Sequence, residues 1–224
     1  MQIADTIRTL QAELGSNCRL IAVSKTQPDE KILEAYAAGQ RLFGENKVQD
    51  LTAKAERLPK DIEWHMIGHL QRNKVKYIAP FVHLIHSVDS LRLLEEIDKQ
   101  GEKNKRIIHC LLQMHIATEE TKFGFDFQEL TQALPEIAKM KWVTIQGLMG
   151  MATLTEDTGR IRTEFRQLKQ LFDRLKTTAT SPNLEMKELS MGMSSDYRIA
   201  VEEGSTLVRI GTTIFGARHY PASL

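Results

Sequence analysis

The chain has 224 residues, of which 42% are hydrophobic and 26% are charged. This length and composition are typical of a globular protein with a substantial core, and we expect one domain spanning residues 1–224. The formal net charge of +1 at pH 7 produces no overall field that would attract nucleic acid or a membrane surface. Neither is an expected partner.

The two cysteines indicate a reducing compartment. Cys18 and Cys110 are far apart in the sequence and neither belongs to a Cys-x-x-Cys pair. The first residues are polar and amphipathic, without the continuous apolar stretch of an export signal or a membrane span. We therefore predict a cytoplasmic protein.

The first half of the chain alternates between helix and strand patterns after an initial helix. Ile3, Ile7, Leu10 and Leu14 follow helical spacing, and Gly15 ends this first helix. The patterns then predict strands over 20–24, 41–44, 62–67 and 83–88, with helices over 28–39, 45–58, 70–79 and 89–100 between and after them.

The second half repeats the alternation. Strands are predicted over 106–116, 143–149, 187–191 and 207–210, and helices over 126–138 and 159–176, with a short helix that Ser194 or Ser195 caps and Gly204 ends. Eight strands, each followed by a helix or a turn, favour an α/β fold: a parallel (β/α)8 barrel of the TIM type with an extra N-terminal helix. An open doubly wound sheet is the alternative.

Two polar turns near the end of the chain predict a phosphate site. Ser194 follows the seventh strand, and Gly211 and Thr212 follow the eighth. Such turns present backbone N–H groups, hydroxyls and a helix N-terminus to an anion. In a (β/α)8 barrel, the loops after strands seven and eight are the usual phosphate site.

A lysine at the end of the first strand indicates that the phosphorylated ligand also carries an aldehyde. Lys25 ends that strand, which lies beside the eighth strand in a closed barrel. An amine beside a phosphate site suggests a phosphorylated aldehyde held as a Schiff base. Arg209, if it faces inward, could donate to a ring nitrogen and keep it unprotonated; an exposed position at the rim is the alternative.

Other residue clusters have simpler interpretations. His65 and His69 flank a strand end and Gly68, and His83 and His86 are expected on opposite faces of a strand, so we predict no metal site. Four methionines gather at the ends of strands six and seven, where they pack in the core or form a soft wall for a flat ligand: Met149, Met151, Met191 and Met193.

Eight motifs occur along the chain from about residue 20 to 218. They are Ile21-Ala22-Val23-Ser24-Lys25-Thr26, Phe43-Gly44-Glu45-Asn46-Lys47-Val48-Gln49, Trp64-His65-Met66-Ile67-Gly68-His69-Leu70-Gln71-Arg72-Asn73-Lys74, Thr121-Lys122-Phe123-Gly124, Gly147-Leu148-Met149, Leu189-Ser190-Met191-Gly192-Met193-Ser194, Val208-Arg209-Ile210-Gly211-Thr212 and Ile214-Phe215-Gly216. In these motifs and their order, the sequence resembles the pyridoxal 5′-phosphate (PLP) homeostasis proteins, whose barrel is similar to the alanine racemase N-terminal domain.

The resemblance implies a role for each matching site residue. Lys25 would form the Schiff base with PLP, and Arg209 would face the pyridine nitrogen. The other expected cofactor-binding residues are Ser194, Gly211 and Thr212 at the phosphate, and Asn46 and Met193 near the cofactor. Lys122 lies in the family's Thr-Lys-x-Gly loop, and the resemblance makes it a candidate for a secondary role in cofactor handling.

The expected function is therefore binding of PLP for intracellular vitamin B6 homeostasis, without significant turnover. PLP-dependent apo-enzymes are candidate recipients, and a monomer is expected because the family's usual dimer contact lies on a further domain. One alternative is a PLP-dependent racemase or decarboxylase, which the resemblance implies would need that second, β-rich domain. The other is a Schiff-base aldolase acting on a phosphorylated substrate, which would carry no resident chromophore.

Overall fold

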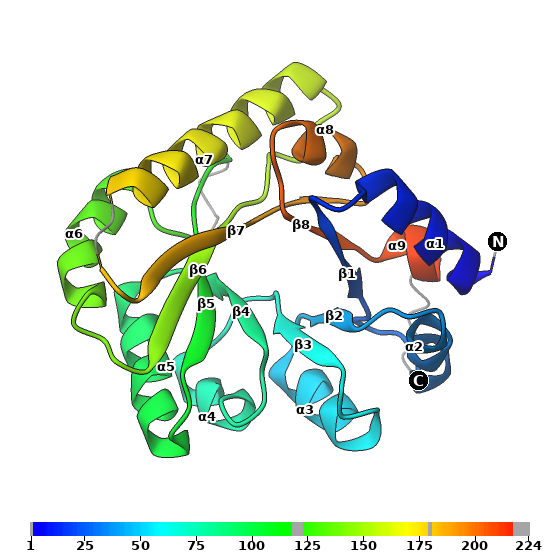
Figure 1. The fold of residues 1–224 in the computed structure, drawn as a ribbon, viewed down its shortest axis with the longest axis horizontal. Helices are drawn as coiled ribbons and strands as arrows, with labels where there is room; N and C mark the ends of the chain where they lie inside the picture. Colours follow the sequence, from blue (N-terminus) through cyan, green and yellow to red (C-terminus); the bar gives the residue numbers. More distant parts are fainter. Residues whose placement is uncertain (1, 118–122, 179–180, 217–224) are drawn as a thin grey trace, which may run out of the picture.

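A computed structural model describes residues 2–117, 123–178 and 181–216 of the chain. Within these residues, eight parallel strands form a closed barrel in sequence order, with β8 hydrogen-bonded to β1 (Figure 1). The predicted (β/α)8 barrel is confirmed, and the open sheet is wrong. The strands are β1 Arg19–Val23, β2 Leu42–Glu45, β3 Glu63–Met66, β4 Leu84–Val88, β5 Ile108–Gln113, β6 Val143–Met149, β7 Leu184–Met193 and β8 Leu207–Ile210.

Helices surround the barrel on its outside (Figure 1). The predicted extra helix is present as α1, which precedes the barrel and packs against α2 and α9. Among the described helices, none is both long enough and apolar enough to cross a membrane. They are α1 Ile3–Leu14, α2 Asp29–Ala37, α3 Val48–Arg57, the 3₁₀ helix η1 Arg72–Lys74, α4 Val75–Ile78, α5 Leu91–Asn104, α6 Phe127–Ile137, α7 Thr158–Thr178, α8 Tyr197–Glu202 and α9 Thr212–Phe215.

The core has two layers because successive strand residues point to opposite faces. The larger layer lies between the strands and the helices. The smaller one lies inside the barrel and consists of Ile21, Leu84, Leu111, Met149 and Leu207. Buried polar side chains share the barrel interior with this small apolar cluster: His65, His86, Ser190 and Arg209.

The helix predicted over 70–79 is the largest departure from the sequence pattern. Gln71 has an extended backbone, with φ −74° and ψ 139°, so no helix begins before Arg72. Two short pieces, η1 and the single turn α4, take the place of the predicted helix. Pro80 then removes a backbone N–H donor, which ends the helical hydrogen-bond ladder.

Two predicted strands have different lengths in the structure. The strand predicted over 106–116 is shortened to β5. Met114 still donates its backbone N–H to the oxygen of Met149, but it pairs with Phe125 in an isolated bridge outside the barrel. The strand predicted over 187–191 extends to Leu184–Met193, because the ladder between β6 and β7 already begins at Leu184 and continues past an irregularity in register. The polar side chains at its start conceal this extension in the sequence.

Candidate functional site

A cavity of about 570 Å³ opens at the carboxyl ends of the strands, a size suited to a small-molecule ligand. All seven residues that the sequence analysis assigned to cofactor binding line this one cavity: Lys25, Asn46, Met193, Ser194, Arg209, Gly211 and Thr212. These seven residues are far apart in the sequence, but they come together because the carboxyl ends of all strands in a parallel barrel lie at one rim.

Lys25 follows β1 and is held by a tight turn. The backbone N–H of Gln27 donates to the oxygen of Ser24 at 3.0 Å, and Thr26 adopts a φ of +64°. A β-branched residue rarely takes this left-handed conformation, which costs on the order of 1–3 kcal/mol. The surrounding contacts therefore impose the turn, and with it the position of Lys25 on the cavity wall.

A buried ion pair supports the ends of β1 and β2. Lys54 of α3 donates to Glu45 Oε1 at 2.7 Å and to the backbone oxygen of Ser24 at 2.8 Å. The Ser24 hydroxyl donates to the same carboxylate oxygen at 2.6 Å. Burial raises the pKa of the Glu45 carboxyl, while the charge of Lys54 lowers it. These contacts fix the residues immediately before Lys25 and Asn46, and sequence reasoning missed them.

Asn46 lies against the backbone of Gly68. Its Oδ1 is buried, and no described residue donates a hydrogen bond to it. A Cβ atom at Gly68 would lie 2.3 Å from the backbone oxygen of Asn46, so only glycine permits this close approach of the two loops. An acceptor left without a donor at a cavity wall can accept a hydrogen bond from a ligand.

Arg209 faces the barrel interior and is only 5% exposed. Its Nη1 donates to the backbone oxygen and the hydroxyl of Ser190, at 2.9 and 2.6 Å, and its Nη2 donates to the oxygen of Gly150 at 3.1 Å. The alternative of an exposed rim position is therefore wrong. Burial lowers the pKa of the guanidinium to about 10, and the charge of Asp196 opposes this shift. Arg209 remains protonated at neutral pH.

The loops after β7 and β8 both contribute to the cavity. Neither Ser194 nor Ser195 caps α8, because the N-cap is Asp196, whose carboxylate instead accepts the backbone N–H of Met193 at 2.6 Å. Both serines line the cavity. The helices α8 and α9 have only six and four residues, so their dipoles are small. An anion here would depend on backbone N–H groups and hydroxyls.

The four methionines divide between the two roles considered for them. Met149 and Met191 are buried in the core, at 1% and 0% exposure. Met151 and Met193 are partly exposed and line the cavity. Lys122 lies outside the described residues.

The closed barrel and its cavity define the class of protein, a (β/α)8 barrel with a ligand-sized cavity at the carboxyl ends of its strands. The family model described as alanine racemase, N-terminal domain, matches residues 1–219. Proteins named pyridoxal phosphate homeostasis protein are similar over nearly the whole chain. The one from Aquifex aeolicus is 42% identical over 94% of this chain and 92% of its own length. The one from Haemophilus influenzae is 35% identical over 100% of this chain and 99% of its own length. The chain belongs to the pyridoxal phosphate homeostasis protein family.

Solved structures agree with this assignment. PipY of Synechococcus elongatus without PLP has a TM-score of 0.91 at 40% identity, and PipY with PLP bound has 0.88 at 39%. Each match covers 96% of this chain and 100% of PipY. Alanine racemase from Bartonella henselae has a TM-score of 0.72 at 16% identity, over 96% of this chain and 58% of the racemase. That likeness shows the fold alone.

Proposed function

We propose that this protein binds PLP in the cavity at the carboxyl end of its barrel and serves PLP homeostasis in the cytoplasm, without significant turnover. The observation that carries the proposal is the convergence of a lysine, a buried arginine and two hydroxyl-bearing loops on one cavity. PipY, which is 39% identical, has been solved with PLP bound. PLP-dependent apo-enzymes are the proposed recipients, and the protein is proposed to act as a monomer.

The residues present fit this cofactor. When bound, PLP supplies an aldehyde that condenses with an amine and a pyridine ring that withdraws electrons. Lys25 would provide the amine, and Ser194, Gly211 and Thr212 would hold the phosphate. Arg209 would face the pyridine nitrogen, where a guanidinium can only donate a hydrogen bond. The unpartnered Oδ1 of Asn46 would accept a hydrogen bond from the ligand, and Met193 would pack against the ring.

The phosphate group is expected to supply much of the affinity. Charge-assisted hydrogen bonds contribute roughly 1.5–3 kcal/mol each. Two such bonds lost in unphosphorylated pyridoxal would weaken binding by on the order of a hundredfold or more, because about 1.4 kcal/mol is tenfold. Titration of the cofactor-free protein with PLP and with pyridoxal, monitored by absorbance, measures the ratio of the two affinities. Equal affinities for pyridoxal and PLP would remove the phosphate contacts from the proposal.

The chemistry of the cavity wall favours binding over racemisation. Racemisation needs an acid or base on each face of the substrate carbon. Among the described residues that line the cavity, Lys25 and Arg209 are the ones with titratable side chains. Tyr36 and Tyr197 donate their hydroxyl hydrogens elsewhere, to Asp61 and Glu13 at 2.6 and 2.7 Å. Tyr77 lines a different cavity, and Tyr220 lies outside the described residues.

We therefore expect no significant racemase or decarboxylase activity. PLP-loaded protein incubated with a panel of L-amino acids should release no carbon dioxide and produce no D-isomer above trace levels. The comparison is the same incubation with the Lys25→Ala variant, which measures the reaction of free PLP. Turnover well above trace that disappears in this variant would contradict a purely binding function and support the racemase or decarboxylase alternative.

A further inference from the structure

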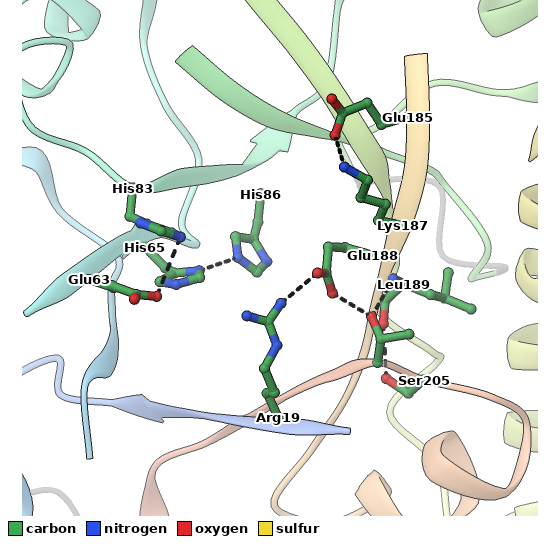
Figure 2. A network of polar contacts seen from close by, with 11 residues as sticks. Arg19, Glu63, His65, His83, His86, Glu185, Lys187, Glu188, Leu189 and Ser205 are labelled. Carbon is green, nitrogen blue, oxygen red and sulfur yellow. Dashed lines mark hydrogen bonds and ion pairs between the residues drawn. The ribbon is translucent and has the colours of Figure 1, made fainter. Parts of the chain in front are cut away.

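We propose that Glu63, His65 and His83 form a binding site for a divalent transition-metal ion at the amino-terminal end of the barrel. Glu63 and His65 belong to β3, and His83 immediately precedes β4 (Figure 2). A potential ligand atom from each residue lies within 4.8 Å of those from the other two. This end of the barrel is opposite the cavity, which the carboxyl ends of the strands surround.

The prediction that His83 and His86 point to opposite faces of a strand is wrong. Alternation along a strand does not apply, because His83 lies before β4 begins at Leu84. Both rings pack near His65, with centroid distances of 5.3 Å for His83 and 5.1 Å for His86.

The imidazole of His65 provides the most direct indication of a ligand. The residue is 1% exposed, and its Nδ1 lies 2.8 Å from Nε2 of His86. Its Nε2 is buried and has no hydrogen-bond partner among the described residues. A buried polar atom left unpaired costs about 1–3 kcal/mol. A metal ion that accepts the Nε2 lone pair would remove this cost.

Glu63 and His83 have the spacing and the exposure that two further ligands need. Oε2 of Glu63 and Nε2 of His83 are 3.4 Å apart. In a tetrahedral zinc site, with metal–ligand bonds of about 2.0–2.2 Å, neighbouring ligand atoms are roughly 3.3 Å apart. The two side chains are 39% and 44% exposed, which gives an ion a path from solvent. Water would occupy the fourth position.

The ligand types select the class of metal. Two imidazoles and one carboxylate suit Zn²⁺, Co²⁺, Ni²⁺ or Cu²⁺, whereas Mg²⁺ and Ca²⁺ prefer oxygen ligands. Two cationic side chains at the same end are ion-paired, Arg19 with Glu188 and Lys187 with Glu185 at 2.7 Å (Figure 2). A third, Arg106, donates to the backbone oxygens of Ala79 and Val82.

Metal binding at His65 would also set proton positions along a buried chain of hydrogen bonds. Nδ1 of His86 is 2.9 Å from the hydroxyl of Ser190, which accepts a hydrogen bond from Arg209 at 2.6 Å. A metal on Nε2 of His65 requires the proton on Nδ1. His65 then donates to His86, and His86 donates from Nδ1 to Ser190. If the protein binds PLP as proposed above, this series of hydrogen bonds ends at Arg209, the residue that faces the cofactor.

The test is a calorimetric titration of the full, untagged chain with Zn²⁺ after chelator treatment, with Mg²⁺ as the comparison ion. The variants are Glu63→Gln and His83→Gln, both at partly exposed positions that should leave the fold intact. The matched control is His69→Asn, since His69 also pairs with one carboxylate, Asp89, at 3.0 Å but belongs to no three-ligand group among the described residues. Any zinc bound at the cavity, on the opposite end of the barrel, would be bound by the wild type and by all three variants. It would therefore cause no difference between them.

We expect one Zn²⁺ per chain in the wild type and in His69→Asn, and no saturable binding of Mg²⁺. Loss of an outer-shell partner alone weakens metal binding by about 10- to 100-fold, so loss of a direct ligand in either variant should cost at least that much. Nitrogen-15 NMR should find the proton of His86 on Nδ1 in the zinc-loaded wild type. Absence of stoichiometric zinc binding, or unchanged affinity in both variants, would overturn the site independently of PLP binding.

Discussion

Replacement of Lys25 by alanine should abolish covalent attachment of PLP and leave the barrel folded. Lys25 is the second residue after β1 and lies on the cavity wall, outside both layers of the core. The wild type, mixed with PLP and reduced with borohydride, should carry one pyridoxyl group, which peptide mass mapping assigns to Lys25. The Lys25→Ala variant should carry none and should lose the absorption band of the Schiff base.

The matched control is Lys47→Ala. Lys47 is an exposed lysine next to Asn46, but it does not line the cavity. It should retain full labelling and an unchanged spectrum. The opposite result, in which the wild type is labelled on another lysine such as Lys122, would show that the attachment site is assigned to the wrong residue.

Replacement of Lys54 by methionine should destabilise the protein strongly and in a pH-dependent manner. The substitution leaves the Glu45 carboxylate buried without its cation, and breaking a buried ion pair typically costs about 3–5 kcal/mol. Burial already raises the pKa of Glu45, and loss of Lys54 removes the main opposing charge. A carboxyl whose folded-state pKa is raised favours folding when protonated, and this contribution is lost as the pH rises. The destabilisation should therefore be smaller at pH 5 than at pH 8.

Urea denaturation at the two pH values measures this effect. Lys139→Met is the control, because Lys139 forms an exposed ion pair with Glu136 and such pairs contribute about 0–1 kcal/mol. The double variant Glu45→Gln, Lys54→Met should recover part of the lost stability, since no charge is then left buried. If Lys54→Met destabilises no more than the control, at either pH, the ion pair does not support the ends of β1 and β2.

The sequence by itself predicted the order of the elements and the residues that come together at the cavity. The bounds of β6 and β8 and of α1 agree with the predicted ranges, since each has a strong apolar periodicity and clear end signals such as Gly15. Because the strands are parallel and close on one another, all strand ends reach one rim. Lys25 and Thr212 could therefore be assigned to one site from their positions after strands one and eight.

Only the tertiary structure decided which buried polar side chains meet. Lys54 reaches Glu45 and Ser24 from a helix, Gly68 approaches the backbone of Asn46, and His86 contacts a serine 104 positions away in the sequence. Local patterns report which face of an element is apolar, but they carry no information on the register between strands. In a barrel, that register determines which interior side chains share a layer, and so which polar groups can satisfy one another.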